Sequence, residues 1–503
     1  MKKILALLLL VTLASALFPV LAQEDSAQPV TMMGYEPAEN YRSWEDNLFF
    51  SRMQERTGIS FVFRQYGKQD EYQAALESLK NNQNDLPQVL FKANLNPITA
   101  KKLYDDGVLI DLAPYLQEHA PNFYRLMEEN PEIRRAITLE NGVIPALPYV
   151  LSNMGQNILW INTAWLNELN LAMPTTMDEL EKVLTAFQTG DPNRNGKKDE
   201  IPLSFIGSYD LKYLAHAFGL IANDFNIFVK DGVVKYMPME EAFKPFIQKM
   251  AEMYKNGLLD KDGFSTIDSL RRVTDTKTAN RYGAFFSPLP TGVVPLEWTS
   301  QYQAMLPLTC NGEAVYRAVA GKVNYGTFAL TASCTDIPGM LSWVDYLYTE
   351  EGAKLASIGL QNEDYVVDGD GSWRLLSDKV DNLYVAKVVI SNDQSAPGIS
   401  NEDYQLLYSD KTVRELTRQT ASVAAVSKLP FPDIPLTEED AAKLAPLQAR
   451  LGRFVDESIA RFVLGEWETD DEQFTLFEQE LKTMGVDDFV ALWQAIYDKG
   501  MGK

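Results

Sequence analysis

One stretch of this sequence carries the residue types and the spacing of a calcium-binding loop. Residues 191–202 read DPNRNGKKDEIP, so side chains that end in oxygen stand on alternate residues, and Gly196 stands where such loops turn sharply. The predicted ligands are side-chain oxygens and one backbone carbonyl, from Asp191, Asn193, Asn195, Lys197 (carbonyl), Asp199 and Glu200. A set of oxygen ligands suits the hard Ca²⁺ ion, whereas Zn²⁺ prefers the His or Cys side chains that this stretch lacks.

The loop departs from an EF-hand at its end. Pro202 takes the twelfth position, where an EF-hand carries a bidentate Glu, and we expect Glu200 to substitute for it. The segment IPLSFIG that follows has a strand pattern, so a calcium sensor is not expected. A polar turn that binds no metal is the alternative. The alternate spacing favours a structural Ca²⁺, whose closed ligand shell leaves no position for catalysis.

Catalytic chemistry has less support. The two histidines, His119 and His216, each fall in a predicted helix with no metal-ligand partner at a fixed spacing, and we interpret both as surface or capping residues. The sequence contains no HExxH, GxSxG or P-loop motif. A glycosidase-like pair of carboxylates stays open, because a chain with 69 acidic residues can always supply one. We therefore expect a protein that is not an enzyme, with a secreted glycan-degrading enzyme as the alternative.

The elements that must position this loop alternate between strands and helices. Strand patterns over residues 58–67 and 86–94 flank a helix pattern over residues 70–82. This order predicts parallel strands in an α/β fold. Just before the loop, the sequence predicts a helix with Thr176 as N-cap, Glu179 completing a capping box, and Gly190 at its end.

The N-terminal segment predicts export. Two lysines precede an apolar run and then small residues, which is the layout of a secretory signal peptide over residues 1–22. A membrane anchor is the competing interpretation, because the run is just long enough to span a bilayer. No cysteine stands near the cleavage point, so a lipid anchor is not expected. The mature chain is therefore expected to be extracytoplasmic.

Charge and cysteine content limit the partners further. The formal net charge of -23 repels the phosphates of nucleic acids, so no nucleic-acid partner is expected. Cys310 and Cys334 are the only cysteines. In an exported chain they fit either one disulfide or two buried free thiols, and both possibilities stay open.

Four segments in a fixed order resemble the family 1 solute-binding proteins, the extracellular sugar-binding components of bacterial ABC importers. The closest resemblance is to the large alginate-oligosaccharide-binding type. The segments are LENGVIPALPYV to DPNRNGKKDEIPLS (139–204), YKNGLLDKDGFST (254–266), WVDYLYTEEGAKLASIGLQNEDY (343–365) and LKTMGVDDFVALWQAIYDKG (481–500). In that family the loop that matches residues 191–200 holds a structural Ca²⁺, so the resemblance implies the same ligands here.

The resemblance also implies an architecture and partners. Two periplasmic-binding-protein-like α/β lobes would close by a hinge over a carbohydrate, which permease subunits would then receive, and the chain would be a monomer. The expected N-terminal lobe comprises residues 23–150 and 328–360, and the C-terminal lobe comprises residues 151–327 and a helix-rich part in 361–503. Hinge crossovers are expected near residues 149–155, 324–331 and 360–365. Unlike many relatives, this chain has no lipid-anchor cysteine, and Gln88 replaces their usual Asp.

A sugar-binding site needs aromatic faces beside side chains that hydrogen-bond to hydroxyl pairs. In folds of this kind, ligands bind beyond the carboxyl ends of strands. That rule selects aromatic and polar residues that follow predicted strands or lie at the first crossover: Tyr35, Trp44, Lys92, Asn94, Tyr149, Phe286 and Trp298. For each aromatic residue, packing in the core is the alternative role.

Overall fold

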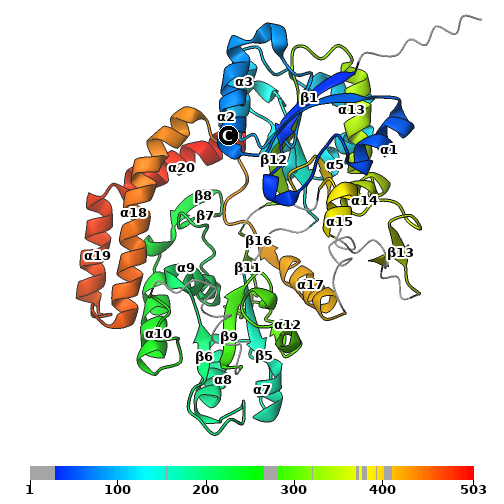
Figure 1. Cartoon of the computed structure of the whole chain (residues 1–503). Helices are drawn as coiled ribbons and strands as arrows, with labels where there is room; N and C mark the ends of the chain where they lie inside the picture. The colour runs from blue at the N-terminus through cyan, green and yellow to red at the C-terminus, as the bar shows by residue number, and fades with distance from the viewer. Residues whose placement is uncertain are drawn as a thin grey trace, which may run out of the picture.

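The computed structural model describes residues 29–152, 157–265, 280–319, 321–369, 373–376, 382–391, 394–400 and 411–502. These residues form two α/β lobes, each with its own sheet, and a group of long C-terminal helices (Figure 1). The signal peptide predicted at residues 1–22 lies outside the described residues. None of the described helices combines the length and the apolar character needed to cross a bilayer.

The first lobe is built on a six-stranded sheet with the strand order β15-β4-β12-β3-β1-β2. Its strands are β1 (Val30–Tyr35), β2 (Phe61–Tyr66), β3 (Val89–Phe91), β4 (Leu147–Val150), β12 (Val323–Leu330) and β15 (Gly398–Ile399). β1 is parallel to β2 and β3, whereas β12 is antiparallel to both β3 and β4. The carboxyl ends of β1, β3 and β4 therefore lie at the same edge of the sheet.

Helices cover both faces of this sheet. Neighbouring strand residues point to opposite faces, and both members of such a pair are buried: Met32 lies in one hydrophobic cluster and Met33 in another. The helices are α1 (Leu48–Thr57), α2 (Gln69–Ser78), α3 (Pro97–Asp105), α4 (Ala113–His119), α5 (Pro121–Glu129), α6 (Pro131–Ile137), α13 (Ile337–Asp345), α14 (Glu350–Ser357) and α15 (Asn382–Val388). A hairpin of β13 (Tyr365–Val367) and β14 (Trp373–Leu375) extends from this lobe.

The second lobe is built on a four-stranded sheet with the order β10-β5-β9-β6. Its strands are β5 (Ile158–Asn162), β6 (Ile201–Ser204), β9 (Tyr282–Ser287) and β10 (Tyr302–Ala304), and the lobe also contains the pairs β7 (Ile227–Lys230) with β8 (Val233–Tyr236) and β11 (Tyr316–Arg317) with β16 (Ser427–Lys428). Its helices are α7 (Thr163–Glu168), α8 (Met177–Thr189), α9 (Gly207–Leu211), the 3-10 helix η5 (Lys212–Phe218), α10 (Phe243–Lys255), α12 (Leu296–Thr299) and α17 (Lys411–Ala424).

Helix α8 leads into the predicted calcium loop. As predicted, Thr176 caps its start by accepting a hydrogen bond from the Glu179 N–H, and Gly190 ends it. The Glu179 carboxylate, which the predicted capping box pairs with the Thr176 N–H, also accepts the N–H and the hydroxyl of Thr175.

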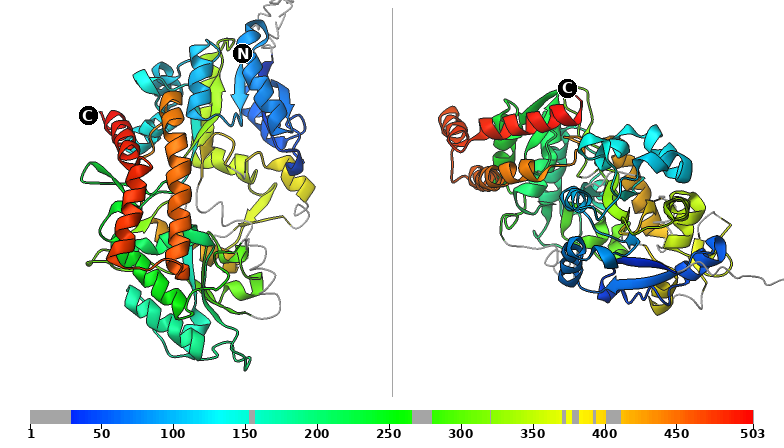
Figure 2. Two further views of the ribbon diagram at one scale, coloured as in Figure 1. Left: turned by 90° about the vertical axis from the view of Figure 1, so that its left-hand side faces the viewer. Right: turned by 90° about the horizontal axis from the view of Figure 1, so that it is seen from above.

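The C-terminal part is helical, as predicted. It comprises α18 (Glu438–Leu464), α19 (Asp471–Thr483) and α20 (Val486–Gly500), which stand together along one side of the molecule (Figure 2). Thr437 and Asp440 form a capping box at the start of α18, and Gly465 ends it in the left-handed conformation with φ 76°. Buried residues of these helices, including Val455 of α18 and Phe489 of α20, join the core of the second lobe.

The lobe boundaries differ from the prediction in two places. β12 begins at Val323, so the crossover predicted at residues 324–331 lies inside a strand of the first sheet. The described residues between 361 and 400 stay with the first lobe, since Gly398 pairs with Tyr149 and Ile390 is buried in the core of that lobe. The crossover predicted at residues 360–365 is therefore wrong too. A short apolar strand does not reveal which of two sheets it will join.

The two cysteines are free thiols, and both are half-buried rather than fully buried. Cys310 follows β10 in the second lobe and Cys334 follows β12 in the first. Burial raises the pKa of the Cys334 thiol to about 11.

Candidate ligand site and calcium loop

The strand directions decide which sheet edges face each other. β4 ends at Val150, and after the crossover the chain enters β5 at Ile158. The carboxyl ends of β1 and β3 lie beside that of β4, at the edge toward the second lobe. In the second sheet Ile158 pairs with Ser287, the last residue of β9, and β6 is parallel to β9. The carboxyl ends of β6 and β9 therefore lie at the edge toward the first lobe. We call these the facing edges.

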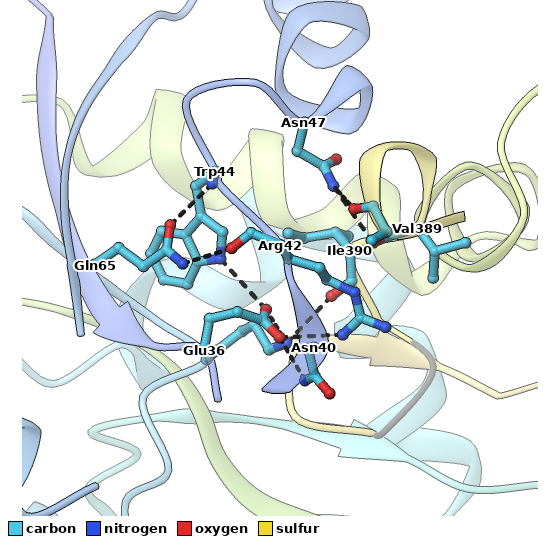
Figure 3. A network of polar contacts seen from close by, with 10 residues as sticks. Glu36, Asn40, Arg42, Trp44, Asn47, Gln65, Val389 and Ile390 are labelled. Carbon is cyan, nitrogen blue, oxygen red and sulfur yellow. Dashed lines mark hydrogen bonds and ion pairs between the residues drawn. The ribbon is translucent and has the colours of Figure 1, made fainter. Parts of the chain in front are cut away.

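A buried carboxylate, that of Glu36, organises the facing edge of the first lobe (Figure 3). Its Oε2 accepts hydrogen bonds from Lys92 Nζ at 2.5 Å and Trp44 Nε1 at 3.4 Å, and its Oε1 accepts from Arg42 at 3.1 Å and Asn40 at 2.6 Å. Glu36 and Lys92 are fully buried in their side chains. Buried charges persist only when they are paired and hydrogen-bonded, so this network fixes the segment after β1 against the end of β3.

The same network ties the first edge to the end of α15 and the segment after it. Lys92 Nζ donates to the carbonyl of Ile390 at 3.3 Å. Asn47 caps α1 with its side-chain oxygen and donates with its amide nitrogen to the carbonyls of Ala386 and Val389, as Figure 3 shows in part. Residues 386–390 are thereby held beside the carboxyl ends of β1 and β3.

Two predicted ligand residues on this lobe are corrected by the structure. Trp44 has no exposed surface, and its indole packs against the rings of Phe50, Phe63 and Phe91 at 5.5–6.0 Å between centroids. Lys92 also has no exposed surface, because Glu36 neutralises it inside the lobe. Both follow or adjoin strand ends as predicted, but their side chains point inward, which the sequence position alone does not show.

Three other predicted residues keep exposed surface on the first lobe. Tyr35 is half-buried and stacks on Tyr72 with ring centroids 6.0 Å apart, and burial followed by the charges of Glu39 and Glu36 raises its pKa. Asn94 is exposed just after β3, and Tyr149 is half-buried near the end of β4. Their part in ligand binding stays a prediction.

On the second lobe, the two predicted aromatic residues differ in exposure. Phe286 is buried and packs on Tyr213 with ring centroids 6.1 Å apart, so its predicted ligand role is corrected to a core role. Residues of β9 are buried on both faces, which is why a ring there faces the core whichever way it points. Trp298, on α12, packs partly against the core and keeps some exposed surface.

The sequence reasoning missed an aromatic and cationic cluster at the facing edge of the second lobe. Tyr209 lies on α9, shortly after β6, and is 40% exposed. Its ring lies 5.5 Å from that of Tyr213, and their hydroxyls are 3.1 Å apart. The guanidinium of Arg317 lies 4.4 Å from the Tyr213 ring and pairs with the carboxylate of Asp224. We call these four residues the Tyr209 cluster.

The signal for this cluster is partly local. Tyr209 and Tyr213 stand four residues apart directly after a strand, a spacing that places two rings on one side of a helix. Arg317 and Asp224 reach the cluster from distant segments, so only the fold brings them there. Exposed aromatic rings beside charged hydrogen-bonding groups are what a sugar requires.

His216 supports the Tyr209 cluster, and its position shows that another prediction is wrong. It is buried, not on the surface. Its Nε2 accepts the N–H of Leu308 at 2.9 Å, so Nδ1 carries the proton and donates it to the carbonyl of Tyr213 at 2.5 Å. Burial lowers the pKa of His216 to about 4. The neutral ring therefore holds the backbone of η5 at Tyr213, whose ring belongs to the Tyr209 cluster.

The predicted calcium loop folds back on itself as its sequence indicates. Asp191 accepts the N–H groups of Asn195 and Gly196 at 3.0 and 3.1 Å, and Asn195 accepts the N–H of Lys197 at 2.7 Å. Gly196 takes φ 71°, the left-handed conformation expected where the loop turns. Asp199 accepts the side-chain amides of Asn195 and Asn193 at 2.9 and 3.5 Å, and these bonds, the Asn195 bond first, lower its pKa.

The donor set of this loop fits a cation. Glu200 Oε1 is buried and has no hydrogen-bond partner among the described residues. Burial, and then the charges of Asp199 and Asp191, raise the pKa of Glu200, as happens where carboxylates converge without a neutralising charge. Among the described residues, no three His, Cys, Asp or Glu side chains are placed as metal ligands. The three carboxylates of the predicted set, those of Asp191, Asp199 and Glu200, are therefore not gathered as a preformed metal site among the described residues.

The loop lies at the end of the second lobe away from the facing edges. It connects α8 to the amino end of β6, whereas the Tyr209 cluster follows the carboxyl end of that strand. Arg281 donates to the carbonyl of Asp199 at 2.9 Å and so attaches the loop to the start of β9. A cation here would stabilise the lobe without touching a ligand between the lobes.

Comparison with known proteins gives a consistent picture. No family model matches the chain. It is 24% identical over 494 residues to the fructooligosaccharide ABC transporter substrate-binding protein FusA of Streptococcus pneumoniae serotype 4, covering 90% of this chain and 87% of FusA.

Solved structures share the two-lobed fold. The HMO-binding, ABC-transporter-associated solute-binding protein of Bifidobacterium longum infantis matches with a TM-score of 0.76 and 20% identity, over 94% of this chain and 99% of that chain. An EF-hand mutant of FusA matches at 0.65 with 21% identity, over 94% and 100%. The alginate-binding protein AlgQ2, solved without calcium ion, matches at 0.61 with 19% identity, over 94% and 98%. The homologues are thus sugar-binding proteins of ABC transporters rather than enzymes, which confirms the predicted resemblance and fold class.

Proposed function

We propose that this protein is the extracytoplasmic solute-binding component of an ABC importer, that it captures an oligosaccharide between the facing edges of its two lobes, and that it delivers this ligand to permease subunits without altering it. The observation that carries the proposal is the similarity to FusA along 90% of the chain. Export through the signal peptide at residues 1–22 and action as a monomer belong to the same proposal.

The structure supports a hinge mechanism for capture. A ligand that contacts Tyr209 on one lobe and Tyr35 or Asn94 on the other gains all of its contacts only when the lobes approach, so binding favours the closed arrangement. The lobes are also joined by the exposed ion pairs Lys102–Glu438, at 2.6 Å, and Lys499–Glu140. Exposed pairs of this kind contribute little to stability, so they do not prevent the lobes from moving.

The proposal includes one structural Ca²⁺ on the second lobe. Its ligands would be the loop oxygens listed from the sequence: Asp191, Asn193, Asn195, Lys197 through its carbonyl, Asp199 and Glu200. Glu200 Oε1, which is buried and has no hydrogen-bond partner among the described residues, supports this assignment, as do the EF-hand mutant of FusA and the AlgQ2 structure described as being without calcium ion. The ion would neutralise converging carboxylates and hold α8, the loop and β9 together.

The deciding experiment is calorimetric titration of the mature protein, residues 23–503, with a panel of neutral and acidic oligosaccharides, followed by chromatography of the recovered sugars. The proposal expects saturable binding of at least one oligosaccharide, which is recovered unchanged. Release of shorter sugars would establish the glycan-degrading alternative. Absence of binding across the panel would overturn the carbohydrate assignment.

A further inference from the structure

Four of the described cationic side chains at the two facing edges lie beside a carboxylate. Lys92 and Arg42 share the carboxylate of Glu36 on the first lobe. On the second lobe, Arg317 pairs with Asp224, and the buried Lys212 pairs with Asp456 at 3.2 Å. On the second lobe each of these cations has a carboxylate beside it, and on the first lobe the two cations that share Glu36 are themselves buried, so these groups offer little accessible positive charge to an anionic ligand.

The carboxylates are more accessible than the cations. The side chain of Arg317 is 4% exposed and that of Asp224 is 48% exposed, so a ligand that approaches the Tyr209 cluster meets the carboxylate before the guanidinium. On the first lobe Lys92 is buried, whereas Glu39 is exposed near Tyr35. Lys322, which leads into β12, forms no ion pair within the described part of the chain. Among the described residues around the Tyr209 cluster and Tyr35 the accessible charges are thus mainly negative, and the chain as a whole carries a net charge of -23.

We infer that the ligand is an uncharged oligosaccharide, and that Asp224 sets this specificity by neutralising Arg317 and rejecting uronic acids. The inference rests on the proposed function and narrows it. A neutral sugar can stack on Tyr209 and donate its hydroxyl protons to Asp224 with no charge to desolvate. A uronate carboxylate at the same place would meet a like charge, which costs affinity.

The test compares two sets of probes by calorimetry, at low and at high salt. Neutral probes are fructan, glucan, galactan and milk-type oligosaccharides; acidic probes are trigalacturonate and an alginate trimer. The inference expects neutral probes to bind at least about tenfold more tightly than the uronates, with an affinity for neutral probes that salt changes by less than about twofold. Tighter binding of a uronate, weakened by salt, would overturn the inference and leave the proposed function standing. Binding of neither class would overturn both.

A substitution isolates the role of Asp224. In Asp224→Asn, Arg317 keeps its charge but loses its carboxylate, so the affinity for trigalacturonate should rise about tenfold at low salt. Asp85→Asn is the matched control, since Asp85 pairs with Arg64 at 2.5 Å near the amino end of β3, away from the facing edges. Its net charge change is the same, and it should leave both affinities unchanged.

The remaining outcomes are also informative. If both variants raise trigalacturonate affinity equally, the effect is one of overall charge, and the role of Asp224 is refuted. If wild-type protein binds a uronate and Lys322→Gln abolishes that binding, the ligand is anionic and Lys322 recognises it. Thermal melts confirm that each variant is folded, and the wild-type comparison of probes does not depend on any variant.

Discussion

Protonation of His216 should destabilise the protein at mildly acidic pH. The buried ring is neutral, accepts the N–H of Leu308 at Nε2, and donates from Nδ1 to the carbonyl of Tyr213. A second proton would turn Nε2 into a donor facing another donor, and it would place a charge in the core. The pKa of His216 is accordingly lowered from 6.5 to about 4 by burial.

The sign and the size follow from proton linkage. Between about pH 6.5 and about pH 4 the unfolded chain has bound a proton at His216 that the folded chain has not, so the free energy of unfolding falls as the pH falls. Each pKa unit corresponds to about 1.4 kcal/mol, so the full loss attributable to this residue is about 3 kcal/mol. It is complete below about pH 4 and absent above about pH 6.5.

Urea unfolding at several pH values between pH 7.5 and pH 4, on wild-type protein and on His216→Gln, measures this loss. The Gln amide can donate to the Tyr213 carbonyl and accept from the Leu308 N–H, but it does not titrate. Carboxylates that titrate in the same range affect both proteins equally and cancel in the difference. We expect wild type to lose about 3 kcal/mol more than the variant over this range. Curves that run parallel within about 0.5 kcal/mol would show that His216 is not the titrating group.

Three further predictions test the core around Trp44, the predicted calcium loop and the Tyr209 cluster. Trp44→Ala should lower the free energy of unfolding by about 3–5 kcal/mol in urea titrations, because its indole is fully buried among aromatic rings; a loss below about 1 kcal/mol would contradict that burial. Chelation of Ca²⁺ should lower the thermal midpoint by a few degrees and added Ca²⁺ restore it, since saturation at about 100 times Kd contributes about 2.7 kcal/mol. Asp191→Ala should remove this response and Asp85→Ala should keep it. Tyr209→Ala should weaken oligosaccharide binding at least about tenfold in calorimetry with little change in the thermal midpoint, because the ring is 40% exposed; unchanged affinity would place the ligand elsewhere.

Local patterns predicted part of the structure well. The helix after Thr176, its end at Gly190, and the helical C-terminal part all follow from capping residues and apolar spacing, which act within a few residues of the chain. The turn at Gly196 follows from the same kind of local signal. Strand membership was less predictable, because Gly398 and Ile399 join the first sheet through pairing with residues about 250 positions away.

The candidate ligand site shows the same division. Counting residues after predicted strands selected Tyr35 and Asn94, which keep exposed surface, but also Trp44, Lys92 and Phe286, which are buried. Whether a ring after a strand points to solvent depends on what packs over it, and for Trp44 that is a cage of phenylalanines from three separate segments.

The amino-acid sequence by itself determined the α/β alternation, the oxygen-rich loop at residues 191–200 and the resemblance to sugar-binding proteins, because each depends on residue types and short spacings. Only the tertiary structure decided which aromatic rings are accessible, that Glu36 neutralises Lys92, and that Arg317 meets Tyr213 and Asp224. Burial and ion pairing arise from side chains that are far apart along the chain, and only the packing within each lobe brings these side chains within contact distance.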